Sequence, residues 1–79
     1  MSEDKPDREI DCIGLYCPEP VFRTRQELDE MAPGEILSVE ADDPAAEEDI
    51  KRLTKNLGHE LVNFRKESNR LYFLIKKVE

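Results

Sequence analysis

The sequence predicts a two-layer α/β sandwich with the element order β-α-β-α-β-β, in which two helices cover one face of a four-stranded mixed sheet. Three observations predict this class. Two segments carry apolar residues at helical spacing, with proline near the start and glycine after the end. Between and after them lie short runs rich in β-formers, with alternating apolar and polar residues. The chain has 79 residues, which is enough for one domain with a modest core.

The first strand is predicted over residues 9–13, and Gly14 ends it. Residues 1–8 are polar and contain Pro6, so we expect a disordered N-terminal tail there. The folded domain is therefore expected to span residues 9–79.

The first helix is predicted over residues 18–32. Val21, Leu28 and Met31 recur at helical spacing and would face the sheet. Pro33 and the glycine after it stop the helix, because proline cannot continue it and glycine tolerates the left-handed conformation. Cys17 is expected as the N-cap of this helix.

The segment EILSVEAD, residues 35–42, alternates as a strand. Asp43 and Pro44 then predict a second helix, with the aspartate as N-cap and the proline at the first helical position. Gly58 closes this helix. Its apolar stripe consists of Ala46, Ile50, Leu53 and Leu57.

Two further β-rich runs, residues 59–67 and 70–78, are joined by a tight turn at residues 68–69. Strand-helix-strand crossovers favour parallel neighbours, whereas this final hairpin adds an antiparallel pair. The last strand is interpreted as a sheet edge, which Lys76 and Lys77 would protect against unwanted pairing.

Charge and composition limit the function classes. The net charge is −7, so direct binding to a nucleic-acid backbone is disfavoured, and proteins with basic docking surfaces are the expected partners. The N-terminus lacks the apolar region of a signal peptide, and the run LYFLI is too short to span a bilayer. We therefore expect a cytoplasmic protein that does not enter membranes. A carrier that visits several partners is best served as a monomer.

The acidic residues around the second helix start are interpreted as capping groups and solvated charges, not as a catalytic carboxylate pair. Carboxylates at this end of a helix are favourable because the N-terminus carries a partial positive charge. These residues are Asp42, Asp43, Glu47, Glu48 and Asp49.

Cys17 stands directly before Pro18, Glu19 and Pro20, a Cys-Pro-x-Pro element at a helix start. The prolines stiffen the turn and remove only amides that lack an intrahelical partner. The positive helix end favours a thiolate, which Glu19 partly opposes. The sequence thus predicts an accessible, nucleophilic Cys17 whose pKa lies below that of a free cysteine.

The segments GLYCPEPV, PGEILSVEADDPA and GHELV, in this order and spacing, resemble the TusA (SirA-like) family of sulfur carriers. The resemblance covers nearly the whole predicted domain, and Cys-Pro-x-Pro is its most specific part. It implies that Cys17 carries sulfane sulfur as a persulfide, while Gly14, Pro18, Glu19 and Pro20 shape and position the turn. It implies no metal or organic cofactor.

The resemblance also implies partners. The sulfur donor would be a cysteine desulfurase or a rhodanese-like protein, and the acceptor would be the thiol of another sulfur-relay protein. Destinations in the family include tRNA thiolation, molybdenum cofactor metabolism and sulfur oxidation. Such a chain is a sulfurtransferase-type carrier rather than a stand-alone enzyme.

Three residues after the motif are candidate docking groups. Phe22 lies one step off the apolar stripe, and either fills a gap at the sheet edge or forms an apolar patch beside the thiol. Arg23 and Arg25 are interpreted as solvated helix residues, with a docking or electrostatic role as the alternative.

Cys12 and His59 have plain structural interpretations. Cys12 is expected to be a buried strand thiol, with a role as resolving thiol for Cys17 as the alternative. A pair of cysteines spaced C-x4-C with a single histidine does not predict a metal site. His59 is expected to be a turn residue with an exposed imidazole.

Two other functions compete with sulfur transfer. The first is a non-catalytic protein-interaction or regulatory module, in which the motif merely shapes a surface loop. The second is a redox sensor that uses Cys12 and Cys17. Loss of sulfur transfer in Cys17→Ser would separate the carrier from the module, and a Cys12 variant would separate it from the sensor.

Overall fold

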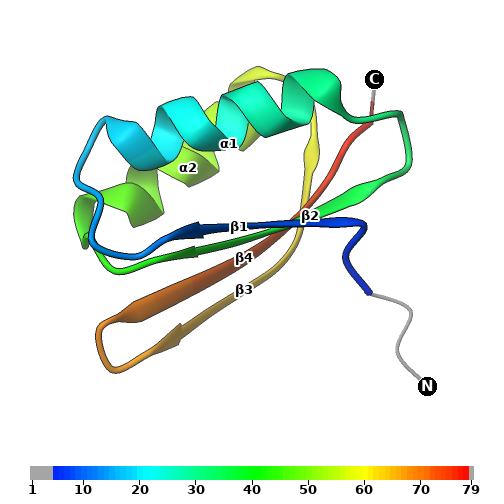
Figure 1. Cartoon of the computed structure of the whole chain (residues 1–79). Coiled ribbons are helices and arrows are strands. Elements are labelled where there is room, and N and C mark those ends of the chain that lie inside the picture. Colours follow the sequence, from blue (N-terminus) through cyan, green and yellow to red (C-terminus); the bar gives the residue numbers. More distant parts are fainter. Residues whose placement is uncertain (1–4, 79) are drawn as a thin grey trace.

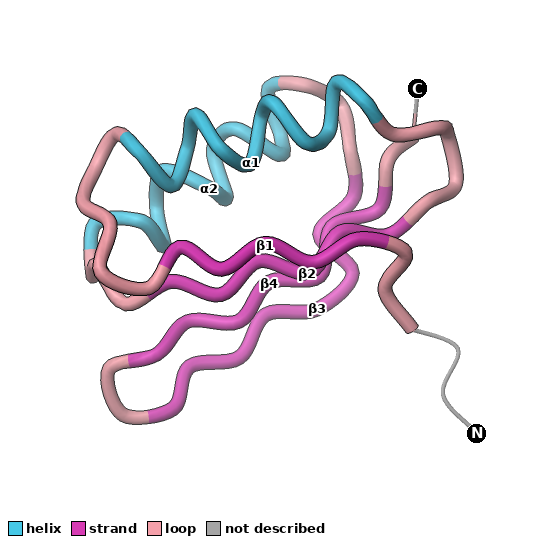
Figure 2. Tube along the Cα trace, in the orientation of Figure 1, coloured by secondary structure: helices cyan, strands magenta, loops and turns pink. Residues whose placement is uncertain are grey.

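Two helices lie on one face of a four-stranded mixed sheet, and the opposite face of the sheet is open (Figures 1 and 2). The computed structural model describes residues 5–78. The predicted fold class and element order are confirmed. The elements are β1 (Arg8–Cys12), α1 (Glu19–Glu30), β2 (Ile36–Ala41), α2 (Ala45–Asn56), β3 (Glu60–Glu67) and β4 (Arg70–Lys76).

The strand order is β1-β2-β4-β3. β1 runs parallel to β2 and places Ile10 beside Val39. β4 is antiparallel to both of its neighbours, so that Phe73 lies opposite Val39 on one side and Phe64 on the other. This register keeps large apolar side chains on the helix-covered face, because side chains alternate between the two faces of a strand.

The core lies between the sheet and the helices. Ile50 of α2 and Leu28 of α1 are fully buried. Two buried threonines, Thr24 and Thr54, each donate the hydroxyl to the carbonyl four residues earlier, which satisfies their polar atoms inside the core. The sheet residues of the core are Cys12, Leu37, Val39, Ala41, Leu71, Phe73 and Ile75.

Both helices begin one residue later than predicted. Pro18 and Pro44 occupy the N-cap positions, not the first helical positions. At α1 the Glu19 amide is engaged in a turn with the Tyr16 carbonyl at 2.8 Å, and the first helical bond runs from Phe22 to Pro18. Cys17 therefore lies in the loop before the helix rather than at its N-cap.

The C-terminal ends of both helices lie close to the positions predicted from the sequence. Met31 is the C-cap of α1, in extended conformation, so this helix is slightly shorter than predicted. After α2, Gly58 has a φ of 79°, the left-handed conformation expected of a C-terminal glycine. No helix within residues 5–78 is long and apolar enough to cross a membrane.

The prediction that the last strand forms a sheet edge is wrong. β4 lies inside the sheet between β2 and β3, because the hairpin folds back to insert its second strand beside β2. Lys77 is correspondingly buried rather than exposed. Its ammonium group donates to the carbonyl oxygen of Leu28 and so satisfies an acceptor in the last turn of α1.

The predicted tail is also partly wrong. Asp7 exchanges two hydrogen bonds with Ile36, one through its amide at 2.7 Å and one through its carboxylate at 2.8 Å. Arg8 begins β1 and pairs with Glu27 of α1 at 2.9 Å. These contacts join residues 7–8 of the predicted tail to the sheet and to α1. Residues 1–4 of the predicted tail lie outside the described residues.

Candidate functional site

The loop that carries Cys17 lies at the carboxyl ends of the parallel strands β1 and β2. Each of these strands feeds a helix, so the β1–α1 and β2–α2 loops meet at this end, at left in Figure 1. In α/β sheets this edge is where functional groups commonly gather, because consecutive crossovers place two loops side by side. The thiol of Cys17 is exposed there.

Two adjacent carboxylates tie these loops together. Asp42 accepts a hydrogen bond from the amide of Gly14 at 3.0 Å, and Asp43 accepts one from the amide of Cys17 at 2.8 Å. Gly14 has a φ of 84°, a conformation that glycine adopts at little cost. The backbone of the cysteine loop is therefore held from both of its ends by the start of the second helix.

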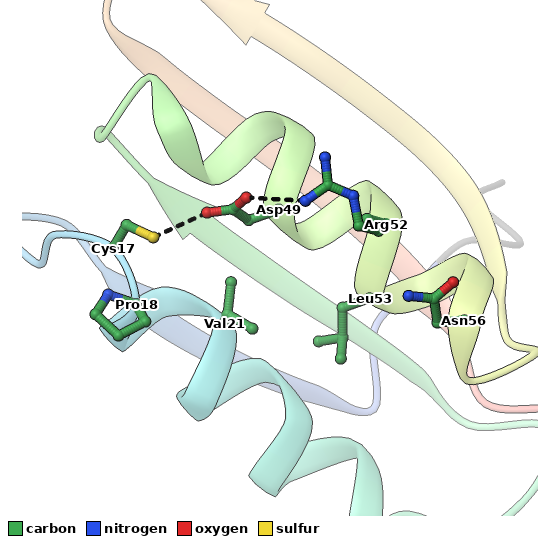
Figure 3. Close-up of a pocket in the computed structure, with 7 residues that line it drawn as sticks. All are labelled: Cys17, Pro18, Val21, Asp49, Arg52, Leu53 and Asn56. Carbon is green, nitrogen blue, oxygen red and sulfur yellow. Dashed lines mark hydrogen bonds and ion pairs between the residues drawn. The ribbon is translucent and has the colours of Figure 1, made fainter.

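The sulfur of Cys17 points at α2. Its Sγ donates to Oδ2 of Asp49 at 2.9 Å, and the other oxygen of this carboxylate lies 3.6 Å from a guanidinium nitrogen of Arg52 (Figure 3). Asp49 and Cys17 are 32 residues apart in the chain. The thiol thus forms a charge-assisted contact with a carboxylate that the sequence analysis assigned to a solvated helix face.

The prediction of a lowered Cys17 pKa is wrong. The hydrogen bond to Asp49 raises the pKa of this thiol above its ordinary value, and desolvation and the negative charges of Asp49 and Asp43 act in the same direction. The helix end and Glu19 are close to Cys17 in the sequence, whereas only the fold brings the carboxylates of Asp49 and Asp43 near the sulfur.

Beside the thiol lies an open groove between α1 and α2, with a volume of about 270 Å³ (Figure 3). Val21 of α1 and Leu53 of α2 form its apolar wall, while Arg52 and Asn56 supply polar groups on the α2 side. A groove of this kind can receive a short partner segment or a sulfur group attached to Cys17. Its lining residues are Cys17, Pro18, Val21, Asp49, Arg52, Leu53 and Asn56.

The family model described as sulfurtransferase TusA matches residues 8–77, which is nearly all of the chain. The chain belongs to the TusA family. A protein of Archaeoglobus fulgidus is 56% identical over 73 residues, covering 91% of this chain and 95% of that protein. The sulfur carrier protein TusA of Allochromatium vinosum is 39% identical over 71 residues, covering 90% and 93% of the two chains.

A solved structure supports the fold. The crystal structure of a SirA-like protein from Desulfitobacterium hafniense superimposes with a TM-score of 0.80 at 23% identity, and the match covers 91% of this chain and 99% of that one. At this identity the likeness establishes the fold alone. The predicted TusA family is confirmed, and the sulfur-carrier role predicted with it agrees with the names of the relatives.

In this TusA-family chain the motif residues after Cys17 divide into two groups. Pro20, in the first turn of α1, is buried, whereas Pro18 is exposed and lines the groove. The Cys17–Pro18 peptide bond is cis. Glu19 is exposed and lies 4.0 Å from the Arg23 guanidinium, on the surface of the helix. Of the three motif residues after Cys17, only Pro18 thus lines the groove beside the thiol.

Two exposed aromatic residues lie within five positions of Cys17 in the sequence. Phe22 is 60% exposed, which excludes the interpretation that it fills a gap at the sheet edge. Tyr16, directly before Cys17, is 74% exposed, and the sequence analysis did not single it out. The position of an aromatic residue directly before the motif cysteine was the feature of the sequence that could have marked Tyr16 as a candidate docking residue. Arg23 and Arg25 are exposed on the same helix.

Cys12 is fully buried in the core beside Ala41 of β2. Burial raises the pKa of its thiol, which keeps it protonated. Both cysteines are free, and only Cys17 is exposed. A buried, protonated Cys12 is poorly suited to attack or resolve a group on Cys17, so the structure favours the core interpretation.

His59 lies beyond the C-terminal end of α2, away from the first half of the helix that holds Asp49. The expectation of an exposed imidazole is wrong: His59 is half-buried, and its Nδ1 accepts a hydrogen bond from the amide of Val78 at 3.1 Å. Burial and the charge of Lys77 lower its pKa. Within residues 5–78, no cluster of His, Cys, Asp and Glu is arranged to hold a metal ion.

Proposed function

We propose that this chain carries sulfane sulfur as a persulfide on Cys17 and passes it to a cysteine thiol of an acceptor protein. The placement of Cys17 supports this proposal most directly: its thiol is exposed beside a groove, at the end of a loop held by Asp42 and Asp43. A nucleophile in such a position is accessible to a cysteine of a larger partner.

The proposed transfer is thiol exchange at sulfane sulfur. The Cys17 thiolate attacks the terminal sulfur of a donor persulfide; a new S–S bond forms, and the S–S bond of the donor breaks. The donor cysteine leaves as a thiolate and takes up a proton from water. In the second step, the acceptor thiolate attacks the terminal sulfur on Cys17, which leaves as a thiolate. No net oxidation occurs, and no metal or organic cofactor takes part.

The partners proposed are those of the family resemblance. A cysteine desulfurase or a rhodanese-like protein supplies sulfur, and the next protein of a relay accepts it. Exposed Tyr16 and Phe22, close to Cys17 in the sequence, would supply apolar contact area to a partner, and exposed Arg23 and Arg25 of α1 would supply polar contacts. We further propose that the chain acts as a cytoplasmic monomer, which leaves this face free for successive partners.

Intact-protein mass spectrometry tests the proposal. The protein is incubated with a cysteine desulfurase and cysteine, and separately with a small sulfane-sulfur donor, and then measured before and after reduction. We expect a gain of one sulfur atom that reductant removes, that Cys17→Ser abolishes and that Cys12→Ala retains. Absence of the gain with both donors, while Cys17 still alkylates, would exclude the carrier function.

The exposed aromatic pair Tyr16 and Phe22 also supports a second candidate, a non-catalytic interaction module. In that case a relay partner would bind Cys17→Ser as strongly as the wild type, and neither form would acquire sulfur. Sulfur loading of the wild type separates the two functions, because only the carrier acquires sulfur; calorimetry alongside it shows whether the partner binds the wild type and Cys17→Ser equally.

A further inference from the structure

The contact between Cys17 and Asp49 poses a chemical problem for a carrier. Sulfur transfer requires the thiolate of Cys17, yet the S–H of Cys17 donates a hydrogen bond to a carboxylate oxygen of Asp49 at 2.9 Å. Deprotonation would place two negative charges against each other at this distance. The arrangement therefore stabilises the thiol form in the free protein.

The other charged groups near the sulfur do not offset Asp49. From the β2–α2 loop, the carboxylate of Asp43 binds the Cys17 amide. From α2, Arg52 pairs with the far oxygen of Asp49 at 3.6 Å, and its side chain is 66% exposed. From α1, Glu19 is the acidic residue of the first turn and lies 4.0 Å from the guanidinium of Arg23, on the exposed surface of the helix. Two carboxylates, Asp49 and Asp43, and one loosely held guanidinium thus lie nearest the sulfur, which favours a cation from outside.

We propose that Asp49 controls the protonation of the carrier thiol: it holds Cys17 protonated in the free protein, and a lysine or arginine of the sulfur donor or acceptor pairs with it and so releases the thiolate. The proposal rests on the carrier role of Cys17. The Asp49 side chain is 26% exposed and lines the open groove, so a partner side chain can reach it. The net charge of −7 steers cationic surfaces towards this protein.

Such control has a physical benefit. An exposed thiolate reacts with oxidants and stray disulfides, whereas a thiol is much less reactive. When a partner cation pairs with Asp49, the repulsion between the carboxylate and the sulfur falls, and the proton of Cys17 passes to water. The thiolate then attacks the donor persulfide as described above. Activation is thereby coupled to docking.

The first test follows alkylation of Cys17 by uncharged iodoacetamide as a function of pH, with the modified residue identified by peptide mass. Asp49→Asn keeps an oxygen acceptor of the same shape but removes the charge. Glu48→Gln removes the same charge from the exposed neighbouring position of α2 and serves as the matched control. Circular dichroism checks that each variant is folded. Asp49→Ser serves as a second variant that removes the carboxylate.

We expect Asp49→Asn to move the midpoint of alkylation to lower pH and to raise the rate at neutral pH several-fold, while Glu48→Gln leaves both unchanged. The gain in rate is smaller than the gain in thiolate, because a less basic thiolate is a weaker nucleophile. An unchanged midpoint in Asp49→Asn and Asp49→Ser would overturn the proposal.

The second test addresses the partner cation. Cys17 is reacted with cystamine, a disulfide that carries two ammonium groups, and with uncharged bis(2-hydroxyethyl) disulfide. In both reactions the Cys17 thiolate attacks one sulfur, the S–S bond breaks, and the other half leaves as a thiolate. For each variant, the rate with cystamine is divided by the rate with the uncharged disulfide. Comparing this ratio between variants cancels the intrinsic difference between the reagents.

We expect this ratio to fall several-fold in Asp49→Asn and to change little in Glu48→Gln. Equal ratios in the two variants would mean that the cation senses only the overall charge, and would overturn the proposal. Neither test uses sulfur transfer. If Cys17 takes up no sulfur from any donor, the proposed function fails, and the two tests still decide the role of Asp49.

Discussion

The carboxylate of Asp43 joins the cysteine loop to the start of α2: one oxygen accepts from the amide of Cys17 at 2.8 Å, and the other accepts from the amide of Ala45 at 3.1 Å. One side chain thus begins α2 and holds the cysteine loop. The expected capping role is confirmed in part, because the aspartate binds the first helical amide although Pro44 occupies the N-cap position.

Asp43→Ala should therefore lower the stability of the fold. Loss of two hydrogen bonds to a charged acceptor at a partly exposed site is expected to lower the free energy of unfolding by about 1 kcal/mol. Urea denaturation measures this loss, and Glu48→Ala is the control for removal of a charge from the start of α2. Equal midpoints for the two variants would contradict the structural role of Asp43.

Gly14→Ala should destabilise the loop through its backbone. Gly14 has a φ of 84°, and nothing lies within 4 Å of the position that a Cβ would occupy, so the cost is conformational rather than steric contact with neighbours. We expect a loss of about 1 kcal/mol in the free energy of unfolding. Asn tolerates this conformation better, so Gly14→Asn should lose less. A larger loss for Asn than for Ala, in matched urea titrations, would refute the explanation.

Folding stability should fall at alkaline pH because of Cys12. Its pKa is raised in the folded state by burial, so the folded protein binds the proton more tightly than the unfolded chain does. The stabilisation that comes from protonated Cys12 is fully present below its unfolded pKa of about 8.5. It is lost as the pH rises through its folded pKa.

Urea midpoints between about pH 7.5 and 9.5 measure this effect before lysine and tyrosine titrate. The fall of the urea midpoint with rising pH should be smaller in Cys12→Ala than in the wild type. Cys17→Ser is the companion variant, because the Cys17 pKa is also raised and its contribution has the same sign. Parallel pH profiles for the wild type and Cys12→Ala would show that the buried thiol is not the cause.

Phe22→Ala should weaken partner binding without unfolding the protein. The ring is 60% exposed, so the change in the free energy of unfolding should stay within about 0.5 kcal/mol. An aromatic anchor at the centre of an interface contributes about 1 kcal/mol or more to binding. Calorimetry with a cysteine desulfurase that loads the protein measures this loss. Val78→Ala, an exposed apolar residue near the C-terminus, should bind as the wild type does.

Most of the fold could be predicted from local patterns. The alternation in β2 placed Leu37, Val39 and Ala41 on one face, and all three are buried in the core. Gly58 and the proline before each helix marked the helix boundaries to within a few residues. These signals are local, because helix period, strand alternation and turn chemistry depend on residues close together in the chain.

The strand order could not be predicted in the same way. Whether β4 or β3 lies beside β2 depends on where the hairpin packs, and both strands have the composition of a sheet strand. The outcome places Ile75 opposite Leu37 and buries Lys77. Long-range pairing of this kind leaves little trace in the pattern of either strand.

By itself, the sequence determined the element order, the apolar faces and the exposed candidate thiol, since periodicity and the Cys-Pro-x-Pro element are properties of neighbouring residues. Only the tertiary structure decided the chemical state of that nucleophile. Asp49 reaches Cys17 across 32 residues of chain because α2 packs beside α1. A thiol pKa reflects the charges within a few ångströms, and the fold, not the spacing along the chain, sets those distances.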